Sequence, residues 1–280
     1  MSIREERIKV FEDTLDFIDY NKKLMESVEY AKEHTNVYFD DEYPAFDESD
    51  VKKMELEVTK ERTFESAMRL HKESETDHIA VMNFGNAFHP GGGVAKGSGA
   101  QEESLCRCST LYPLLTEKYP KDEFYGYHEE LGSSRASDSV IYTENVIICK
   151  TDEDIPKRLE EKDWVKVDVI TAAAPDLRKA EDMHYVEGEE ESMTDAELFG
   201  YHVKRAIHIL TIAASKEVDT LVLGAFGCGA FKNNPRIVAS AYRTALTVFP
   251  KVFNKVVFAV YCTPTDTENY DVFKKILCEI

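Results

Sequence analysis

The 280-residue sequence lacks any apolar run long enough for a membrane-spanning helix. Its first residues, MSIREERIKVFED, also lack the apolar segment of a secretory signal. The six cysteines form no Cys-x-x-Cys pair, and the chain shows no internal repeat or low-complexity tract. We therefore expect an intracellular, cytoplasmic protein with free thiols and no membrane segment. Cys106 and Cys108, with His89 nearby, match no common zinc spacing, so we predict no metal and no cofactor.

Basic residues are scarce: 34 Lys and Arg stand against 53 Asp and Glu, for a net charge of −19. This balance argues against a general nucleic-acid binder. Acidic residues are themselves absent from residues 79–101 and 220–265, and each of these segments contains a glycine-rich loop. Buried strands exclude charge and explain part of this absence, but they do not explain the loops. The pattern favours an anion site.

Hydrophobic spacing predicts alternating helices and strands, with one or two amphipathic helices in residues 1–35. Thr194 with Glu197 is a capping box for a long helix, and Pro235 begins another. The predicted strands lie at 37–39, 54–59, 79–82, 141–142 paired with 146–149, 165–174, 220–223 and 255–262, and the remaining predicted helices at 63–71, 101–115 (broken by Pro113) and 270–277. Residues 176–196 are expected to be a mobile surface loop. The order indicates an α/β sheet covered by helices.

Two glycine-rich loops each follow an apolar strand and precede a helix. Gly91-Gly92-Gly93 comes after the strand at 79–82, and residues 224–231 come after the strand at 220–223. Ligands of α/β sheets bind at the carboxyl ends of strands, so both loops can share one crevice. Bare backbone N–H groups suit phosphate oxygens. Glu102 and Glu103, just beyond the first loop, suit sugar hydroxyls and proton transfer, so we infer a nucleotide-sugar or glycosidic substrate.

Taken together, these motifs resemble the microbial branch of the macrodomain-type poly(ADP-ribose) glycohydrolases. That family's signature is GGG, a short spacer and QEE, and here Gly91-Gly92-Gly93 precedes VAKGSGA and Gln101-Glu102-Glu103. The segments NFGNA at 83–87, SLCRCSTLY at 104–112, TAAAP at 171–175 and LGAFGCGAF at 223–231 complete the likeness. It covers about residues 79–262. A glycine run alone is a common turn, and paired glutamates in a first helical turn are commonly solvated, whereas this combination is specific.

The resemblance implies a macrodomain-like mixed β-sheet sandwiched between helices. Residues 1–75 would be an N-terminal helical extension packed on a catalytic core of residues 76–280. Glu103 would be the catalytic acid and base, and Glu102 the neighbour that fixes the ribose hydroxyls. The residues implied to bind ADP-ribose are Asn86, Gly92, Gly93, Val94, Gln101, Gly227, Cys228, Gly229, Ala230 and Phe231, with Tyr261 as an adenine platform or a core residue.

The implied reaction cleaves ribose–ribose O-glycosidic bonds of poly(ADP-ribose) and releases ADP-ribose, without a metal. Glu103 needs to hold a proton near neutral pH, which burial beside a second carboxylate favours. Lys96, Lys232 and Arg236 would offset the acidity of the chain near the polyanion. We expect a monomer that grips a chain end. Two alternatives remain: a hydrolase of single ADP-ribose units on protein or nucleic acid, or of a related metabolite, and a non-catalytic ADP-ribose-binding macrodomain.

Overall fold

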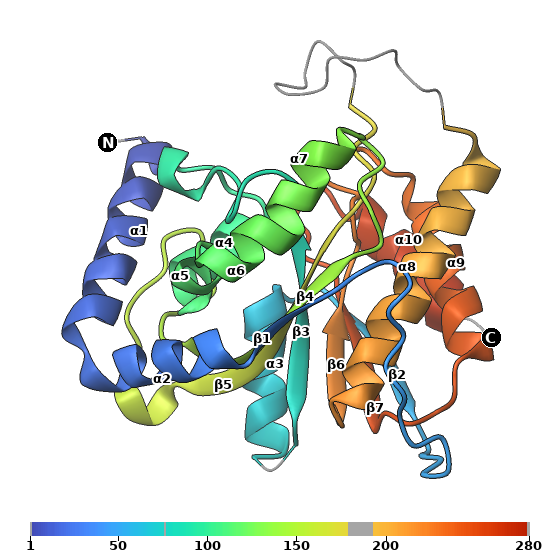
Figure 1. Cartoon of the computed structure of the whole chain (residues 1–280), viewed down its shortest axis with the longest axis horizontal. Coiled ribbons are helices and arrows are strands. Elements are labelled where there is room, and N and C mark those ends of the chain that lie inside the picture. The colour runs from blue at the N-terminus through green and yellow to red at the C-terminus, as the bar shows by residue number, and fades with distance from the viewer. Residues whose placement is uncertain (1, 76, 179–192, 279–280) are drawn as a thin grey trace.

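A computed structural model describes residues 2–75, 77–178 and 193–278 of the chain (Figure 1). The strands are β1 (Thr35–Tyr38), β2 (Glu55–Thr59), β3 (Ile79–Gly85), β4 (Val140–Ile148), β5 (Val165–Ala173), β6 (Thr220–Leu223) and β7 (Lys255–Ala259). The α-helices are α1 (Ile3–Tyr20), α2 (Lys22–Glu33), α3 (Thr63–Glu73), α4 (Gln101–Cys108), α5 (Leu111–Leu115), α6 (Lys118–Pro120), α7 (Tyr127–Leu131), α8 (Asp195–Ser215), α9 (Pro235–Val248) and α10 (Glu268–Cys278). The 3-10 helices η1 (Val94–Lys96) and η3 (Glu161–Asp163) and the π-helix η2 (Lys121–Gly126) complete them.

These strands form one mixed sheet in the order β1-β4-β5-β3-β6-β7-β2. From β5 to β2 the neighbouring strands run parallel, whereas β4 is antiparallel to both β1 and β5. The carboxyl ends of β5, β3, β6 and β7 therefore meet at one edge of the sheet. That edge is where an α/β sheet presents its ligand site.

Alternation along the strands explains why helices cover both faces of this sheet (Figure 1). On β3, Ile79 and Val81 pack into a hydrophobic cluster with α1 to α5, while Ala80 and Met82 face a second cluster with α8, α9 and α10. The strand is buried on both faces, as parallel strands generally are. The predicted macrodomain-like sandwich is confirmed.

The first 75 residues do more than form a helical extension. They contain the predicted helices α1 and α2, but β1 and β2 from the same segment are the two edge strands of the sheet. No boundary of the sheet falls at residue 75, because both edges depend on strands that precede it. The division into an extension of residues 1–75 and a catalytic core of residues 76–280 stays a prediction.

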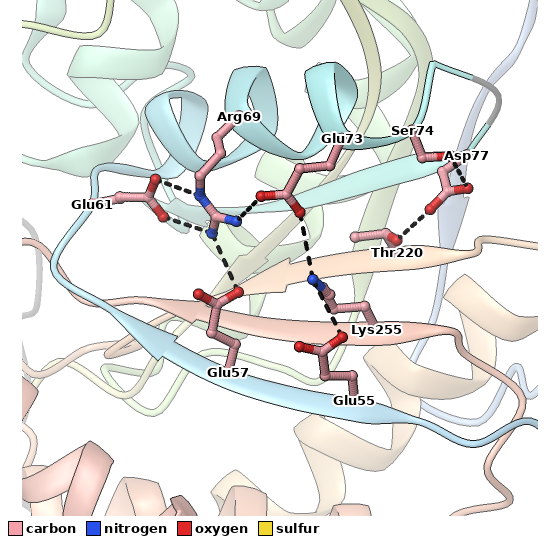
Figure 2. Close-up of polar contacts among 9 residues, drawn as sticks. All are labelled: Glu55, Glu57, Glu61, Arg69, Glu73, Ser74, Asp77, Thr220 and Lys255. Carbon is pink, nitrogen blue, oxygen red and sulfur yellow. Dashed lines mark hydrogen bonds and ion pairs between the residues drawn. The ribbon is translucent and has the colours of Figure 1, made fainter.

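Charged side chains tie the edge strand β2 to the helix above it (Figure 2). Arg69 on α3 contacts carboxylates of Glu57, Glu61 and Glu73 at 3.3, 2.7 and 2.8 Å. Lys255 on β7 lies between Glu73 at 3.5 Å and Glu55 at 3.4 Å. The network holds β2, β7 and α3 in one block, beside the strands that carry the site.

Several local predictions are confirmed and two are wrong. The capping box of Thr194 and Glu197 begins α8, and α9 begins at Pro235. The expected strand pair at 141–149 is one strand, β4, with a register shift between Thr143 and Val146. Asn145 adopts a φ of 62° there and donates its backbone N–H to Asp168. The residues between Thr143 and Val146 therefore form a β-bulge and not a turn between two strands.

The helix expected at 101–115 breaks before Pro113. The break lies at Ser109 and Thr110, because Ser109 forms an isolated bridge with Ile148 and turns the chain toward β4. Residues 118–131 are helical throughout, and Gly126 lies inside the π-helix. Most of the loop expected at 176–196, residues 179–192, lies outside the described residues. Among the helices that the structure describes, none is both long and apolar enough to cross a membrane.

Candidate active site

A cavity of about 1010 Å³ opens at the carboxyl ends of the parallel strands. Gly92 and Gly93 of the loop after β3 line it, and so do Gly227 and Gly229 of the loop after β6. Segments after β5 and β7 contribute Ala174 and Tyr261. The prediction that both glycine-rich loops share one crevice is confirmed.

The first turn of α4 is fastened to the sheet by Gln101. Its Nε2 donates to the backbone oxygen of Met82 at 2.7 Å and to Oγ1 of Thr63 at 3.0 Å, and its Oε1 accepts from the backbone N–H of Phe84 at 2.9 Å. The amide is thus used inside the protein. Gln101 also lines the cavity, so its contact with a ligand stays a prediction, while its internal bonds position the two glutamates that follow.

Glu102 is buried, with 4% of its surface exposed, and lines the cavity. Its Oε2 accepts the backbone N–H of Asn86 at 2.9 Å, while its Oε1 has no hydrogen-bond partner in the described chain. Burial, and then the charge of Glu103, raise the pKa of Glu102 well above its ordinary value. Both effects favour the neutral form of this carboxyl over the charged one.

Glu103 is held by the glycine loop. It is 7% exposed, and its Oε1 accepts the backbone N–H of Gly93 at 2.9 Å, whereas its Oε2 is buried without a partner in the described residues. Gly92 makes this approach possible, with a φ of +56° and no Cβ. A Cβ on Gly92 would lie 2.6 Å from Oε1 of Glu103 and 3.1 Å from Oε2 of Glu102. The triple glycine therefore shapes the seat of both carboxylates.

Asn86 lines the cavity together with the two carboxylates, and its backbone contacts Glu102. Its Oδ1 accepts the backbone N–H groups of Phe88 and His89 at 2.8 and 2.9 Å, which closes the turn after β3. Within the described chain its amide nitrogen donates to no acceptor, and the residue lines the cavity. Asn86 can therefore donate to a bound ligand.

In the second loop, the backbone N–H groups of Gly229, Ala230 and Phe231 donate to no acceptor among the described residues. All three residues line the cavity, so consecutive donors are available to an anion. The guanidinium of Arg178 lies 5.4 Å from the centre of the Phe231 ring. The loop supplies dipoles, and an arginine lies at its side.

Two predicted binding residues do not line the cavity. Val94 is 1% exposed and packs into the hydrophobic cluster under α4. The Cys228 thiol packs against the opposite cluster, 3.6 Å from the backbone oxygen of Phe226, and burial raises its pKa. The side chains of both residues pack against the core and not into the cavity.

The far end of the cavity is aromatic and charged. Tyr261 is 49% exposed, and the guanidinium of Arg62 lies over its ring, 4.0 Å from the centroid. Asp154 accepts from Arg62 at 2.8 Å and from Arg7 at 3.3 Å. Tyr261 is thus a wall residue with one face covered by Arg62.

Sequence reasoning missed most of the cations around the cavity. Arg4, Arg7, Arg62 and Arg178 line it, together with Lys96, which was expected, whereas the expected Lys232 and Arg236 do not. Arg4 and Arg7 come from α1, and the Nε of Arg4 donates to the backbone oxygen of Lys96 at 2.5 Å. No local pattern marks Arg4 and Arg7, because they reach the site through the packing of α1 against the first loop.

The sequence and the fold were compared with protein families and with solved structures. The family model "Microbial-type PARG, catalytic domain" matches residues 13–151. The crystal structure of poly(ADP-ribose) glycohydrolase from Thermomonospora curvata is 28% identical with a TM-score of 0.82, covering 97% of this chain and 99% of that one. The same enzyme bound to the inhibitor ADP-HPD gives a TM-score of 0.79 at the same identity and coverage.

A Deinococcus radiodurans poly(ADP-ribose) glycohydrolase in complex with ADP-ribose is 30% identical, with a TM-score of 0.75 over 90% of this chain and 98% of that one. No curated protein matches the sequence. The identity to the Deinococcus enzyme extends over nearly the whole of both chains, and the two glutamates after the triple glycine lie inside the matched family segment. The chain belongs to the microbial-type poly(ADP-ribose) glycohydrolase family.

Proposed function

We propose that this protein is a poly(ADP-ribose) glycohydrolase that cleaves the ribose–ribose O-glycosidic bond and releases ADP-ribose, with Glu103 as its acid and base. The family membership and the ligands of the related structures support the reaction. One observation carries the assignment of the acid: Glu103 is fixed by Gly93, and its second oxygen has no partner in the described chain, at the wall of the cavity. A carboxyl group arranged in this way can exchange a proton with a substrate.

In the proposed reaction, Glu103 gives its proton to the departing ribose oxygen as the glycosidic C–O bond breaks. The bonding electrons go to that oxygen, and the remaining ribose carbon acquires oxocarbenium character. Water then adds to this carbon and its proton passes to the Glu103 carboxylate. One water is consumed for each ADP-ribose released.

Glu102 and the loops perform the binding in this proposal. Glu102, held by the backbone of Asn86, orients the ribose hydroxyls, and the direction of its pKa shift favours a neutral carboxyl beside an anionic substrate. The free N–H groups of residues 229–231 hold the diphosphate. Adenine is assigned to the Tyr261 end of the cavity, on the face of the ring that Arg62 leaves open.

The reaction is tested by incubating the purified protein with poly(ADP-ribose) without added metal and measuring free ADP-ribose. Glu103→Gln should release none while it still binds ADP-ribose, and the exposed Glu129→Gln on α7 should act like the wild type. Tight ADP-ribose binding with no release by the wild type would refute the glycohydrolase. Defined mono-ADP-ribosylated substrates, offered in parallel, would then separate a hydrolase of another linkage from a binding module.

We also propose that the protein acts in the cytoplasm as a monomer. Its six cysteines are free thiols, which a reducing compartment preserves. Cell fractionation tests the compartment. Size-exclusion chromatography with light scattering tests the monomer, for which a mass of 31.9 kDa is expected.

A further inference from the structure

Asn233 connects two of the loops that line the cavity, although it does not line the cavity itself. It is 2% exposed, and its backbone N–H donates to the oxygen of Gly227 at 3.0 Å. Its Nδ2 donates to the backbone oxygens of Pro175, at 2.7 Å, and Phe231, at 3.1 Å. One amide therefore joins the segment after β5 to the loop after β6.

His202 on α8 fixes the direction of that amide. Its Nε2 lies 2.7 Å from Oδ1 of Asn233. Because both backbone oxygens can only accept hydrogen bonds, the Nδ2 of Asn233 faces them and its Oδ1 faces the imidazole, which must then carry its hydrogen on Nε2. Burial lowers the pKa of His202 to about 4, so the ring is neutral at physiological pH.

A buried histidine at position 202 lowers the stability of the fold unless its hydrogen bond to Asn233 compensates. The ring is 1% exposed and packs edge-on against Phe226 at 5.8 Å, yet its Nδ1 has no partner in the described chain. A buried polar atom without a partner is unfavourable, and an apolar side chain would fill the space without that cost. The hydrogen bond to Asn233 accounts for a histidine here.

The joined segments are two walls of the cavity. Ala174 and Arg178 line it from one segment, and residues 229–231 line it from the other. A second bond between them, from the backbone N–H of Leu177 to the oxygen of Phe231 at 3.0 Å, has the same direction as the amide link. The distance between these two walls therefore depends on the hydrogen bonds of Asn233 and Leu177.

We propose that His202 and Asn233 are a positioning pair that holds the diphosphate-binding loop at the spacing its ligand needs. This inference rests on the proposed function, since it takes ADP-ribose as the ligand. Neither residue touches Glu102 or Glu103, which are held by Asn86 and Gly93 of the other loop. Loss of the pair therefore weakens ligand binding more than it slows the chemical step.

The test compares His202→Leu and Asn233→Asp with the wild type, by calorimetric Kd for ADP-ribose and by kcat and KM on poly(ADP-ribose). Asn233→Asp keeps the shape of the side chain and removes both amide donors. We expect Kd and KM to rise at least tenfold, with kcat within about threefold of the wild type. His202→Gln, which restores a donor, should recover most of the affinity.

His208→Leu is the matched control. His208 is on the same helix, 0% exposed and bonded to the backbone oxygens of Asp138 and Glu42, away from both loops. It should lower Tm and leave Kd unchanged. If His202→Leu does not fold, Asn233→Ser carries the same expectation.

An unchanged Kd in folded His202 and Asn233 variants would overturn the inference. So would an equal loss of affinity in His208→Leu, because the effect would then be general destabilisation. Failure of the proposed function looks different: the wild type would bind ADP-ribose, and the variants would bind it more weakly, with no release from the polymer.

Discussion

Substitution of Gly92 by alanine is the sharpest test of how the catalytic pair is held. The new Cβ would lie 2.6 Å from Oε1 of Glu103, whereas ordinary contact begins near 3.4 Å. The carboxylate would have to retreat by about 0.8 Å, the difference of these two distances, and would weaken its 2.9 Å bond to the N–H of Gly93. Such a shift is large on the scale of catalytic geometry.

Two magnitudes follow from this geometry. A side chain at a φ of +56° costs about 1–2 kcal/mol of stability, because an L-residue is strained in the left-handed region. A misplacement of about 1 Å can lower a rate by about 10²-fold. We expect kcat on poly(ADP-ribose) to fall about a hundredfold in Gly92→Ala. The Kd for ADP-ribose should change only a few-fold, since the second loop is untouched.

The assay is initial release of ADP-ribose at saturating polymer, with Kd measured by calorimetry on the same preparation. Gly200→Ala on α8 is the control, because a Cβ there meets nothing within 4 Å. It should keep full activity and gain up to about 1 kcal/mol of stability from the better helix former. A Gly92→Ala enzyme within threefold of the wild-type kcat would show that this loop does not position Glu103.

Three further outcomes are expected. Tyr261→Ala should weaken ADP-ribose binding by about 1–3 kcal/mol if adenine stacks there; calorimetry decides, and an unchanged Kd would place the base elsewhere. Burial lowers the pKa of His128 and His202 to about 4, so between pH 6.5 and 4 the unfolded chain binds more protons than the folded one. The free energy of unfolding therefore decreases as the pH is lowered through this range. From pH 7 to 5 each should cost about 2 kcal/mol, and urea unfolding of His128→Gln should lose its share of this dependence; an undiminished dependence would contradict the assignment. Arg69→Met removes the cation among three glutamates in Figure 2 and should cost about 1 kcal/mol, a Tm shift of about 2–4 °C that shrinks in high salt; equal Tm values at low salt would exclude a stabilising network.

Local signals in the sequence predicted the elements that depend on local physics. Thr194 and Glu197 form a capping box whose partners are three residues apart, and Pro235 suits only the first turn of a helix, so both helices begin where expected. The strand pair expected at 141–149 is wrong because a bulge and a hairpin turn, here at Asn145, favour the same residue types. Only the pairing of β4 with β5 decides between them.

The sequence by itself determined the site's chemistry: two carboxylates after a triple glycine, and a second bare loop after a buried strand. It could not determine what surrounds them. Arg4 lies 92 residues from its partner Lys96, and Arg7 lies 147 residues from Asp154. The amide of Gln101 donates to Met82 on β3, and His202 on α8 bonds to Asn233 in the loop after β6. Such contacts depend on how packed helices and strands meet, which no spacing along the chain encodes.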